Sequence, residues 1–385
     1  MLRRFAVLLA AAVALAPVLA RPAAAQIKIG VIVSITGPSA SQGIPQRNSL
    51  AMLPKGVGNQ GIEYIVLDDG TDAARAVAGA RKLIDEDGVD AIVGPSTTPA
   101  SLALIPIAAA KQVPVIAFGA SGRIILPMDQ QRRWMFKTSQ NDSLMADAIA
   151  LHMFRAGVRT VGFIGFSDAY GDGWLAEAKR ALEGMTIKLV AVERYARADT
   201  DVSTQARKLI AAQPDAVLVA GSGSPSVTPQ KALRSLGYSG KYYQTHGAAT
   251  IDFIKLGGKD VEGTVLPAGP VLVASQLPDS DPVKEAAQDY VHQYEAAYGA
   301  GSVAPFGAYT YDATTLLRMA IPVALLTAKP GTPEFRASLR NALETAYDLV
   351  LTDGVAEMTP DDHSGFDKRA RVMVTIQDGA WKLLP

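Results

Sequence analysis

The stretch from Gly88 to Ser101 reads G-V-D-A-I-V-G-P-S-T-T-P-A-S and predicts a strand, a sharp turn and the start of a helix. Val89 to Val93 is a short apolar run that suits a parallel strand buried on both faces. Pro99 suits the first turn of a helix, and Ser96 or Thr97 can cap that helix. Hydroxyls and backbone N–H groups therefore converge at the carboxyl end of a strand, where open α/β sheets bind ligands and the helix dipole favours an anion. A cap alone is the simpler interpretation, and we expect the cap together with contact to a ligand.

The first 25 residues have the pattern of a secretory signal peptide. Met1 to Arg4 is basic, Phe5 to Leu19 is almost wholly apolar, and Ala23 to Ala25 offers small residues for cleavage before Gln26. The apolar run is shorter than the roughly 20 residues that a membrane-spanning helix needs, which disfavours a retained anchor. We therefore expect a protein secreted out of the cytoplasm, and the 360 residues that follow the signal suggest two domains.

Charge and cysteine content narrow the class of protein further. After the signal peptide, 34 Lys and Arg residues stand against 37 Asp and Glu residues, a net charge near −3. This balance disfavours nucleic acid or an anionic membrane surface as a partner. Because the chain contains no cysteine, no disulfide can stabilise it outside the cytoplasm, so we expect the hydrophobic cores to do so.

Strand-like and helical patterns alternate twice along the chain, which predicts an α/β fold of two doubly wound units with parallel sheets. The expected strands are 27–35, 62–69, 89–93 and 113–118 in the first unit, and 160–165, 187–192, 216–220 and 241–245 in the second. A polar segment at 137–143 joins the two units. Helical patterns at 283–298, 309–324 and 334–343 have no strands between them, so we expect them to cross back and cover the first unit. Residues 369–377 and 380–384 predict a hairpin around Asp378-Gly379.

Six short strings carry a resemblance to a known family. They are I-K-I-G-V-I-V-S-I-T-G-P (27–38), L-D-D-G (67–70), V-D-A-I-V-G-P-S (89–96), D-A-Y-G-D-G-W (168–174), P-D-A-V-L-V-A-G (214–221) and A-Y-T-Y-D-A (308–313). In this order and spacing, the chain resembles the periplasmic solute-binding proteins of ABC importers, specifically the leucine/isoleucine/valine-binding family with the type I two-lobe fold.

That resemblance implies two lobes joined by three crossovers. Lobe 1 would comprise 26–140 and 271–350, and lobe 2 would comprise 141–270 and 351–385. It also implies a monomer that captures a small carboxylate or amino acid in the interlobe cleft by hinge closure. The partner would be an ABC permease in the inner membrane, to which the protein delivers its ligand.

The resemblance further implies which residues contact the ligand. The carboxylate would be held by residues after the third and fourth strands: Ser96, Thr97, Ala120 and Ser121. Tyr170, which precedes a Gly-x-Gly sequence, would contact the ligand from lobe 2. Arg123, two residues past Ser121, is a further candidate partner for the carboxylate, although arginines in such loops are commonly solvated.

Three positions depart from the leucine-type pattern and alter the expected ligand. The segment that carries the acidic, ammonium-binding residue in that pattern reads Thr245-His246-Gly247 here, and its pocket-lining aromatic residues match Gln42 and Ser222. An ammonium without a carboxylate partner in a cleft costs several kcal/mol. We therefore expect an amine-free aromatic or branched oxo acid first and a branched-chain amino acid second. His246 either donates to a ligand oxygen or is a polar loop residue.

The sequence leaves two other functions open. A sensor domain for a signalling receptor would use the same cleft as an importer's binding protein. A secreted enzyme is disfavoured, because the chain has no cysteine nucleophile, no G-x-S-x-G and no H-E-x-x-H, and its four histidines are scattered. We expect no metal at Asp68-Asp69, which lacks further ligands, and no cofactor at Gly221-Ser222-Gly223, which lacks a third glycine.

Overall fold

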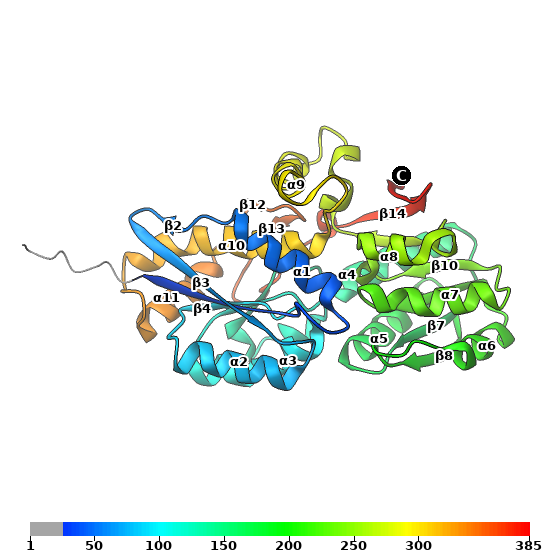
Figure 1. Ribbon diagram of the computed structural model, residues 1–385, viewed down its shortest axis with the longest axis horizontal. Coiled ribbons are helices and arrows are strands. Elements are labelled where there is room, and N and C mark those ends of the chain that lie inside the picture. Colours follow the sequence, from blue (N-terminus) through cyan, green and yellow to red (C-terminus); the bar gives the residue numbers. More distant parts are fainter. Residues whose placement is uncertain (1–25) are drawn as a thin grey trace, which may run out of the picture.

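The computed structural model describes residues 26–385, so the predicted signal peptide lies outside the described residues. Two α/β lobes lie side by side along the longest axis of the molecule (Figure 1). In the described part of the chain, no helix is long and apolar enough to cross a membrane.

Lobe 1 is built on a six-stranded sheet in the order β2-β3-β1-β4-β5-β6. Its strands are β1 (Ile27–Val33), β2 (Gly56–Val57), β3 (Gln60–Asp68), β4 (Ala91–Val93), β5 (Val115–Ala117) and β6 (Met135–Lys137). All neighbours pair in parallel except β2 and β3, which form an antiparallel hairpin. The connecting helices are α1 (Ala40–Ser49), α2 (Ala73–Asp85) and α3 (Thr98–Lys111).

The two faces of β1 explain why this strand is central to lobe 1. Alternate residues from Ile27 to Val33 pack into a core with α10 (Pro305–Leu325) and α11 (Pro333–Leu343). Ile32 points to the opposite face, where it packs with α2 and α3. Gly30 leaves room on that face for Leu83, since a Cβ on Gly30 would lie 2.8 Å from Leu83 Cδ1. Two of the three predicted late helices, α10 and α11, therefore cover the first unit on this face, as the sequence predicts.

Lobe 2 is built on a seven-stranded sheet in the order β15-β14-β11-β10-β9-β7-β8. Its parallel strands are β7 (Thr160–Phe166), β8 (Lys188–Tyr195), β9 (Ala216–Ala220), β10 (Lys241–Gln244) and β11 (Val265–Ala268). The antiparallel strands are β14 (Val372–Gln377) and β15 (Ala380–Leu383), which form the predicted hairpin. Asp378 and Gly379 both have positive φ, as a tight two-residue turn requires.

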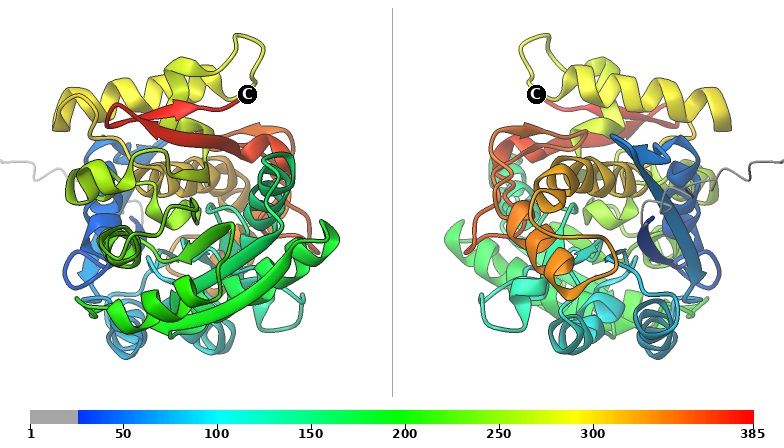
Figure 2. Two further views of the ribbon diagram at one scale, coloured as in Figure 1. Left: turned by 90° about the vertical axis from the view of Figure 1, so that its right-hand side faces the viewer. Right: turned by 90° about the vertical axis from the view of Figure 1, so that its left-hand side faces the viewer.

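Five helices flank the lobe 2 sheet in the described residues, and one more helix packs on the end of α1, where the Tyr290 hydroxyl bonds Ser49 Oγ. The flanking helices are α4 (Asp142–Arg155), α5 (Ala169–Gly184), α6 (Ser203–Ala211), α7 (Val227–Ser235) and α8 (Ile251–Gly257). The remaining helix, α9 (Lys284–Tyr298), lies beside the C-terminal hairpin at one side of the molecule (Figure 2). A short two-stranded sheet, β12 (Leu349–Val350) with β13 (Val355–Ala356), completes the fold.

The polar joint predicted at 137–143 is a buried crossover. Lys137, Thr138, Ser139, Gln140 and Asp142 are all at most 1% exposed. The polar side chains of this segment form hydrogen bonds inside the protein. Thr138 Oγ1 donates to the Tyr309 carbonyl oxygen, and Ser139 Oγ donates to the Gly119 carbonyl oxygen. Polar composition therefore marks a buried network here, not a solvated linker.

Residues 356–363 contact lobe 1, and these contacts help to locate the third crossover between the lobes. Ala356 and Met358 pack in the lobe 1 core, and His363 stacks on Phe136 with ring centroids 4.0 Å apart. The His363 carbonyl oxygen accepts a hydrogen bond from Lys137 N. These contacts support a third crossover near residue 370, later than residue 350, and we propose this division of the lobes.

Buried carboxylates tie this part of the chain together. Asp312 on α10 accepts hydrogen bonds from Thr352 N and Thr352 Oγ1, both at 2.9 Å. Asp353 accepts from Val271 N, which follows the second crossover. Burial raises the pKa of Asp312 to about 7 and raises the pKa of Asp353 as well, the latter helped by the charge of Asp312. Neutral carboxyl groups at this junction avoid the cost of two adjacent buried charges.

The first testable consequence concerns a glycine in α5 that touches the end of β7. A Cβ on Gly171 would lie 1.9 Å from the Phe166 carbonyl oxygen, and the matching position in lobe 1, Gly43, would lie 2.1 Å from that of Ser34. Gly171→Ala should lower the free energy of unfolding by about 2 kcal/mol or more, measured by urea denaturation. Gly184→Ala on the same helix has open space around it and should have no such cost. Equal stability of the two variants would contradict this packing.

A second consequence concerns the pH dependence of stability. Because the folded-state pKa of Asp312 is about 7 and that of an unfolded Asp is about 4, its contribution to stability is full below pH 4 and is lost as pH rises toward 7. Asp312→Asn removes this titration while Thr352 Oγ1 can still bond the amide. The stability of the variant relative to the wild type should therefore increase between pH 4 and pH 7 in urea unfolding. Parallel pH profiles would show that Asp312 is ionised in the folded protein.

Candidate functional site

The carboxyl ends of the parallel strands of both lobes border one small cavity. It lies beside α1 and α3 in lobe 1 and beside α5 in lobe 2. Fourteen residues line it: Gln42, Ser96, Thr97, Thr98, Phe118, Gly119, Ala120, Tyr170, Arg197, Ser222, His246, Gly247, Phe306 and Tyr309. Its volume is about 20 Å³, close to the space that one water molecule needs. A larger ligand could enter only if the lobes moved apart.

The start of α3 supplies the hydroxyl groups of the lobe 1 wall. Thr97 caps the helix, its Oγ1 accepting from Ala100 N at 3.4 Å. Ser96 Oγ accepts from Ser34 N at 2.9 Å and donates to Gln46, so it already holds β1 and α1 in place. Thr98 is 1% exposed, and its Oγ1 has no hydrogen-bond partner within the described chain. A ligand can therefore engage the Thr98 hydroxyl, as donor or acceptor, without breaking an existing bond.

A buried ammonium group supports the next part of the wall. Lys137 Nζ donates to the carbonyl oxygens of Ala120 (2.7 Å) and Ser121 (3.3 Å) and to Asn141 Oδ1 (2.7 Å). Burial lowers the pKa of Lys137 and raises that of Asp142, and each charge partly offsets the shift of the other. The position of the Ala120 loop therefore depends on a lysine at the first crossover.

Tyr170 and His246 form part of the lobe 2 wall. Tyr170 begins α5, where Asp168 caps the helix, and its hydroxyl bonds Thr245 Oγ1 at 2.7 Å and the Gly221 carbonyl oxygen at 3.3 Å. The His246 ring lies 5.7 Å from that of Trp174, and its Nδ1 has no partner among the described residues. Burial, assisted by the charge of Lys137, lowers the pKa of His246 to about 3, so the ring is neutral at physiological pH.

Arg197, which follows β8, is the cationic residue of the lining and was not predicted from the sequence. Its Nε donates to Asp168 Oδ2 at 2.7 Å, and its Nη1 donates to Ser222 Oγ at 3.1 Å and to Ser39 Oγ of lobe 1 at 3.4 Å. The guanidinium also lies over the Phe166 ring, 4.2 Å from its centroid. Arg197 therefore connects the two lobes at the cavity, and Asp168 balances its charge.

Three aromatic rings of lobe 1 complete the lining. Phe118 follows β5, and Phe306 and Tyr309 lie in the first turns of α10. The Tyr309 ring centroid lies 5.7 Å from that of Phe306 and 6.4 Å from that of Phe118. The Tyr309 hydroxyl donates to Gln140 Oε1 at 3.0 Å, which fixes the ring to the first crossover. The cavity therefore offers flat apolar surface as well as polar groups.

The structure brings most of the predicted site residues together. Seven of the nine line the cavity: Gln42, Ser96, Thr97, Ala120, Tyr170, Ser222 and His246. Ser121 is buried beside it and accepts from Arg123 N, while the Arg123 side chain is exposed and does not line the cavity. The prediction missed the other seven lining residues: Thr98, Phe118, Gly119, Arg197, Gly247, Phe306 and Tyr309. The A-Y-T-Y-D-A string contains Tyr309, but no local pattern shows that α10 reaches the ends of β4 and β5.

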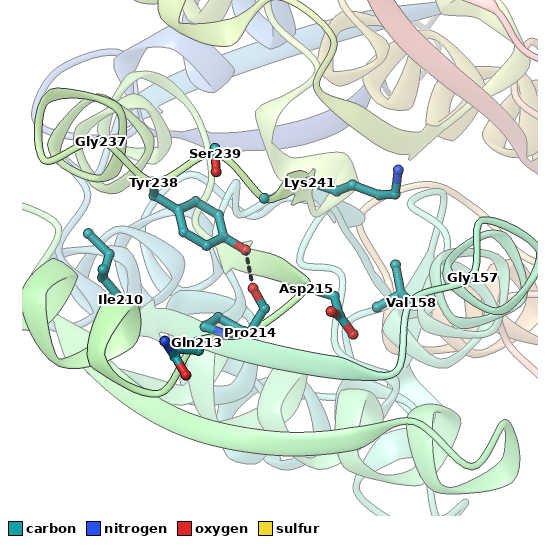
Figure 3. A pocket seen from close by; sticks show the side chains of 11 residues that line it. Gly157, Val158, Ile210, Gln213, Pro214, Asp215, Gly237, Tyr238, Ser239 and Lys241 are labelled. Carbon is teal, nitrogen blue, oxygen red and sulfur yellow. Dashed lines mark hydrogen bonds between the residues drawn. The ribbon is translucent and has the colours of Figure 1, made fainter.

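A wider cavity of about 590 Å³ lies at the opposite edge of the lobe 2 sheet, among the loops that precede β7, β9 and β10 (Figure 3). Its polar groups already hold these loops together. Asp215 Oδ2 accepts from Arg159 N and Thr160 N, both at 2.8 Å, and the Tyr238 hydroxyl donates to the Pro214 carbonyl oxygen at 3.0 Å. Because parallel sheets bind ligands at their carboxyl edge, the interlobe cavity is the better candidate site.

Comparison with known proteins agrees with this geometry. The profile of the family described as "Periplasmic binding protein" matches residues 26–380. The Leu/Ile/Val-binding protein homolog 3 of Brucella melitensis is 25% identical over 64% of this chain and 68% of its own length. Glutamate receptor 2.4 of Arabidopsis thaliana is 27% identical over 67% of this chain, and the match spans only 28% of that receptor.

Solved structures show the same fold. An extracellular ligand-binding receptor from Rhodopseudomonas palustris HaA2 is 44% identical, with a TM-score of 0.91 over 94% of this chain and 100% of its own. A type 1 periplasmic binding protein from Bordetella pertussis is 21% identical, with a TM-score of 0.81 over 94% of this chain and 100% of its own. The predicted type I periplasmic-binding fold is confirmed. The chain belongs to the periplasmic binding protein family.

Proposed function

We propose that this protein is a periplasmic solute-binding protein that captures an amine-free aromatic or branched oxo acid between its lobes and delivers it to an ABC importer. The family consists of solute-binding proteins, not enzymes. The relatives named for leucine, isoleucine and valine binding support a small carboxylate as the ligand. A role without catalysis is part of this proposal.

We base the proposed ligand on the chemical groups that line the interlobe cavity. It contains aromatic rings, hydroxyls, an amide, a neutral imidazole and an arginine, but no Asp or Glu among the described residues. Asp168, which bonds Arg197 next to the cavity, is already paired. An ammonium group would therefore lose its hydration without gaining a carboxylate, which costs several kcal/mol. A ligand that has a carboxylate but no amine avoids this desolvation cost.

The start of α3 would receive the ligand's carboxylate. Thr98 Oγ1 is unpartnered and buried, and it lies at the N-terminus of a 14-residue helix, where backbone N–H groups and the helix dipole favour negative charge. Lys137, buried behind the Ala120 loop, fixes that loop beside the start of α3 by donating to the Ala120 carbonyl oxygen. The planar rings of Phe118, Phe306 and Tyr309 would pack against the apolar part of the ligand.

Ligand contacts with both lobes would favour the closed arrangement, because closure is stabilised only by interactions that the open arrangement lacks. The existing interlobe bonds are few in this region: Arg197 Nη1 to Ser39 Oγ, and Ser224 N to Ser41 Oγ at 3.0 Å. A ligand that bridges α3 and Tyr170 would add to them.

Binding can be tested by thermal unfolding of refolded, ligand-stripped protein. Phenylpyruvate and 4-methyl-2-oxopentanoate should raise Tm by several degrees, because a ligand at one hundred times its Kd stabilises the folded state by about 2.7 kcal/mol. Phenylalanine and leucine, their amino counterparts, should shift Tm less at equal concentration. A larger shift with the amino acids would refute the amine-free assignment.

The carboxylate subsite can be tested with Thr98→Val, which keeps the shape of the side chain and removes the hydroxyl. The affinity for phenylpyruvate, measured by isothermal titration calorimetry, should fall about tenfold, the effect of one lost hydrogen bond to a charged group. Thermal stability should not fall, because the hydroxyl has no partner in the protein. Thr310→Val is the matched control, since Thr310 Oγ1 is also buried and unpartnered but does not line the cavity. Equal affinities of the two variants would remove Thr98 from the site.

Delivery to an importer and signalling through a receptor would use the same cleft. Deleting the gene should abolish uptake of labelled phenylpyruvate at low concentration if the protein serves an importer. Normal uptake with loss of a transcriptional response to the same compound would favour the sensor function.

A further inference from the structure

The polar groups that line the cavity form two sets on different strands. The first set follows β4 and β5 in lobe 1 and β10 in lobe 2: Thr98, Gly119, Ala120 and His246. The second set comprises Gln42 on α1, which follows β1, with Ser222 and Arg197, which follow β9 and β8. No hydrogen bond joins a side chain of one set to a side chain of the other.

Sheet geometry separates the two sets. In lobe 1, β4 lies between β1 and β5, and adjacent strands are about 4.8 Å apart, so β1 and β5 are separated by about 10 Å. In lobe 2, β9 and β7 lie between β10 and β8, which places the ends of those two strands about 14 Å apart. Ala120 and Gln42 therefore follow strands that are not neighbours, and Thr98 lies on the β5 side of lobe 1, since a Cβ on Gly119 would lie 2.9 Å from Thr98 Cα. In lobe 2, the Arg197 side chain reaches back from β8 to Ser222 after β9, which shortens its separation from His246.

The second set is rich in unused hydrogen-bond donors. Gln42 is 2% exposed, and its Nε2 has no partner in the described residues. The Arg197 side chain is 13% exposed, and its hydrogen bonds to described residues are made by Nε and Nη1, leaving Nη2. A Cβ on Gly223 would lie 3.5 Å from Gln42 Nε2, which places that amide against the loop carrying Ser222. Donors from both lobes thus meet at this end.

Charge balance determines which acceptor suits these donors. Asp168 neutralises Arg197 at 2.7 Å, so the guanidinium acts as a donor within a neutral pair. A second carboxylate placed there would share the arginine with Asp168, and two carboxylates at one cation repel. A neutral oxygen would use the unpaired Nη2 and Gln42 amide without that repulsion. The buried Gln42 amide left without an acceptor costs about 1–3 kcal/mol, so the site disfavours a purely apolar end.

We propose that Arg197, Gln42 and Ser222 form a distal subsite that binds a neutral oxygen, such as a ring hydroxyl, at the end of the ligand remote from its carboxylate. This inference rests on the proposed function and narrows it to aromatic oxo acids with an oxygen on the ring. Because Gln42 belongs to lobe 1 and Arg197 to lobe 2, an oxygen bonded to both also stabilises closure of the lobes.

The test compares three ligands that share one carboxylate end: phenylpyruvate, 4-hydroxyphenylpyruvate and 4-methylphenylpyruvate. The methyl compound has a ring substituent of similar size without an acceptor. Calorimetry on the refolded wild-type protein should show 4-hydroxyphenylpyruvate binding at least about tenfold more tightly than 4-methylphenylpyruvate. Arg197→Gln should reduce this ratio to less than about threefold, with a smaller change in the affinity for phenylpyruvate.

Arg194→Gln is the matched control, because Arg194 lies on β8, three residues before Arg197, and pairs with Asp172 outside the cavity. It should keep the wild-type ratio. Gln42→Leu tests the subsite from lobe 1 without touching the Arg197–Asp168 pair, and it should reduce the ratio even if Arg197→Gln does not fold.

Two results would overturn the distal subsite alone: equal wild-type affinities for the hydroxy and methyl compounds, or an unchanged ratio in both Arg197→Gln and Gln42→Leu. Phenylpyruvate would still bind in either case, so the proposed function would stand. Failure of all three compounds to bind the wild-type protein would refute the proposed function and, with it, the subsite.

Discussion

The carboxyl ends of two parallel sheets face each other across the interlobe cavity, and the arrangement of the rest of the molecule depends on this constraint. Parallel strands need a helical crossover after each strand, so every strand end is followed by a loop and the start of a helix. These loops and helix starts carry most of the residues that line the cavity, and α10 adds Phe306 and Tyr309. Gly43 and Gly171 occupy matching positions in the two lobes, where each lets a helix approach the end of its preceding strand. In both lobes, a glycine therefore allows close packing of a helix on a strand end.

Buried polar groups connect the cavity to the crossovers. Lys137 holds the Ala120 loop, Gln140 holds the Tyr309 ring, and Asp353 bonds Val271 after the second crossover. Burial shifts the pKa of Lys137 downward and those of Asp312 and Asp353 upward, which reduces the charge that the interior must accommodate. Hydrogen bonds of fixed geometry, more than apolar contacts, define how the crossover segments approach the cavity walls. The lining therefore keeps its shape because the crossovers are held in place.

The described lining of the cavity is close to charge-balanced. His246 is neutral, Arg197 is balanced by Asp168, and the described lining contains no free carboxylate. The start of α3 is the place where a negative charge finds unused donors, and the aromatic rings provide the apolar surface. Under the proposed function, a carboxylate at α3 and a neutral oxygen near Arg197 would each satisfy donors that are otherwise buried without partners. Such a ligand would contact both lobes and would therefore stabilise their closed arrangement.

The sequence by itself determined the local features of this protein. Apolar runs placed the strands, so that 216–220 was predicted with its observed ends, and Thr97 was predicted as a helix cap because caps depend on neighbouring residues. Seven of the predicted site residues line the cavity, most of them because they lie in or near loops after strands, and Gln42 because the family resemblance implied it. Only the tertiary structure decided that α10 brings Phe306 and Tyr309 to the cavity, that Arg197 lines it and Arg123 does not, and that Lys137 is buried. These facts depend on how crossovers bring distant segments together, and burial, pairing and charge balance between such segments leave no local pattern in the chain.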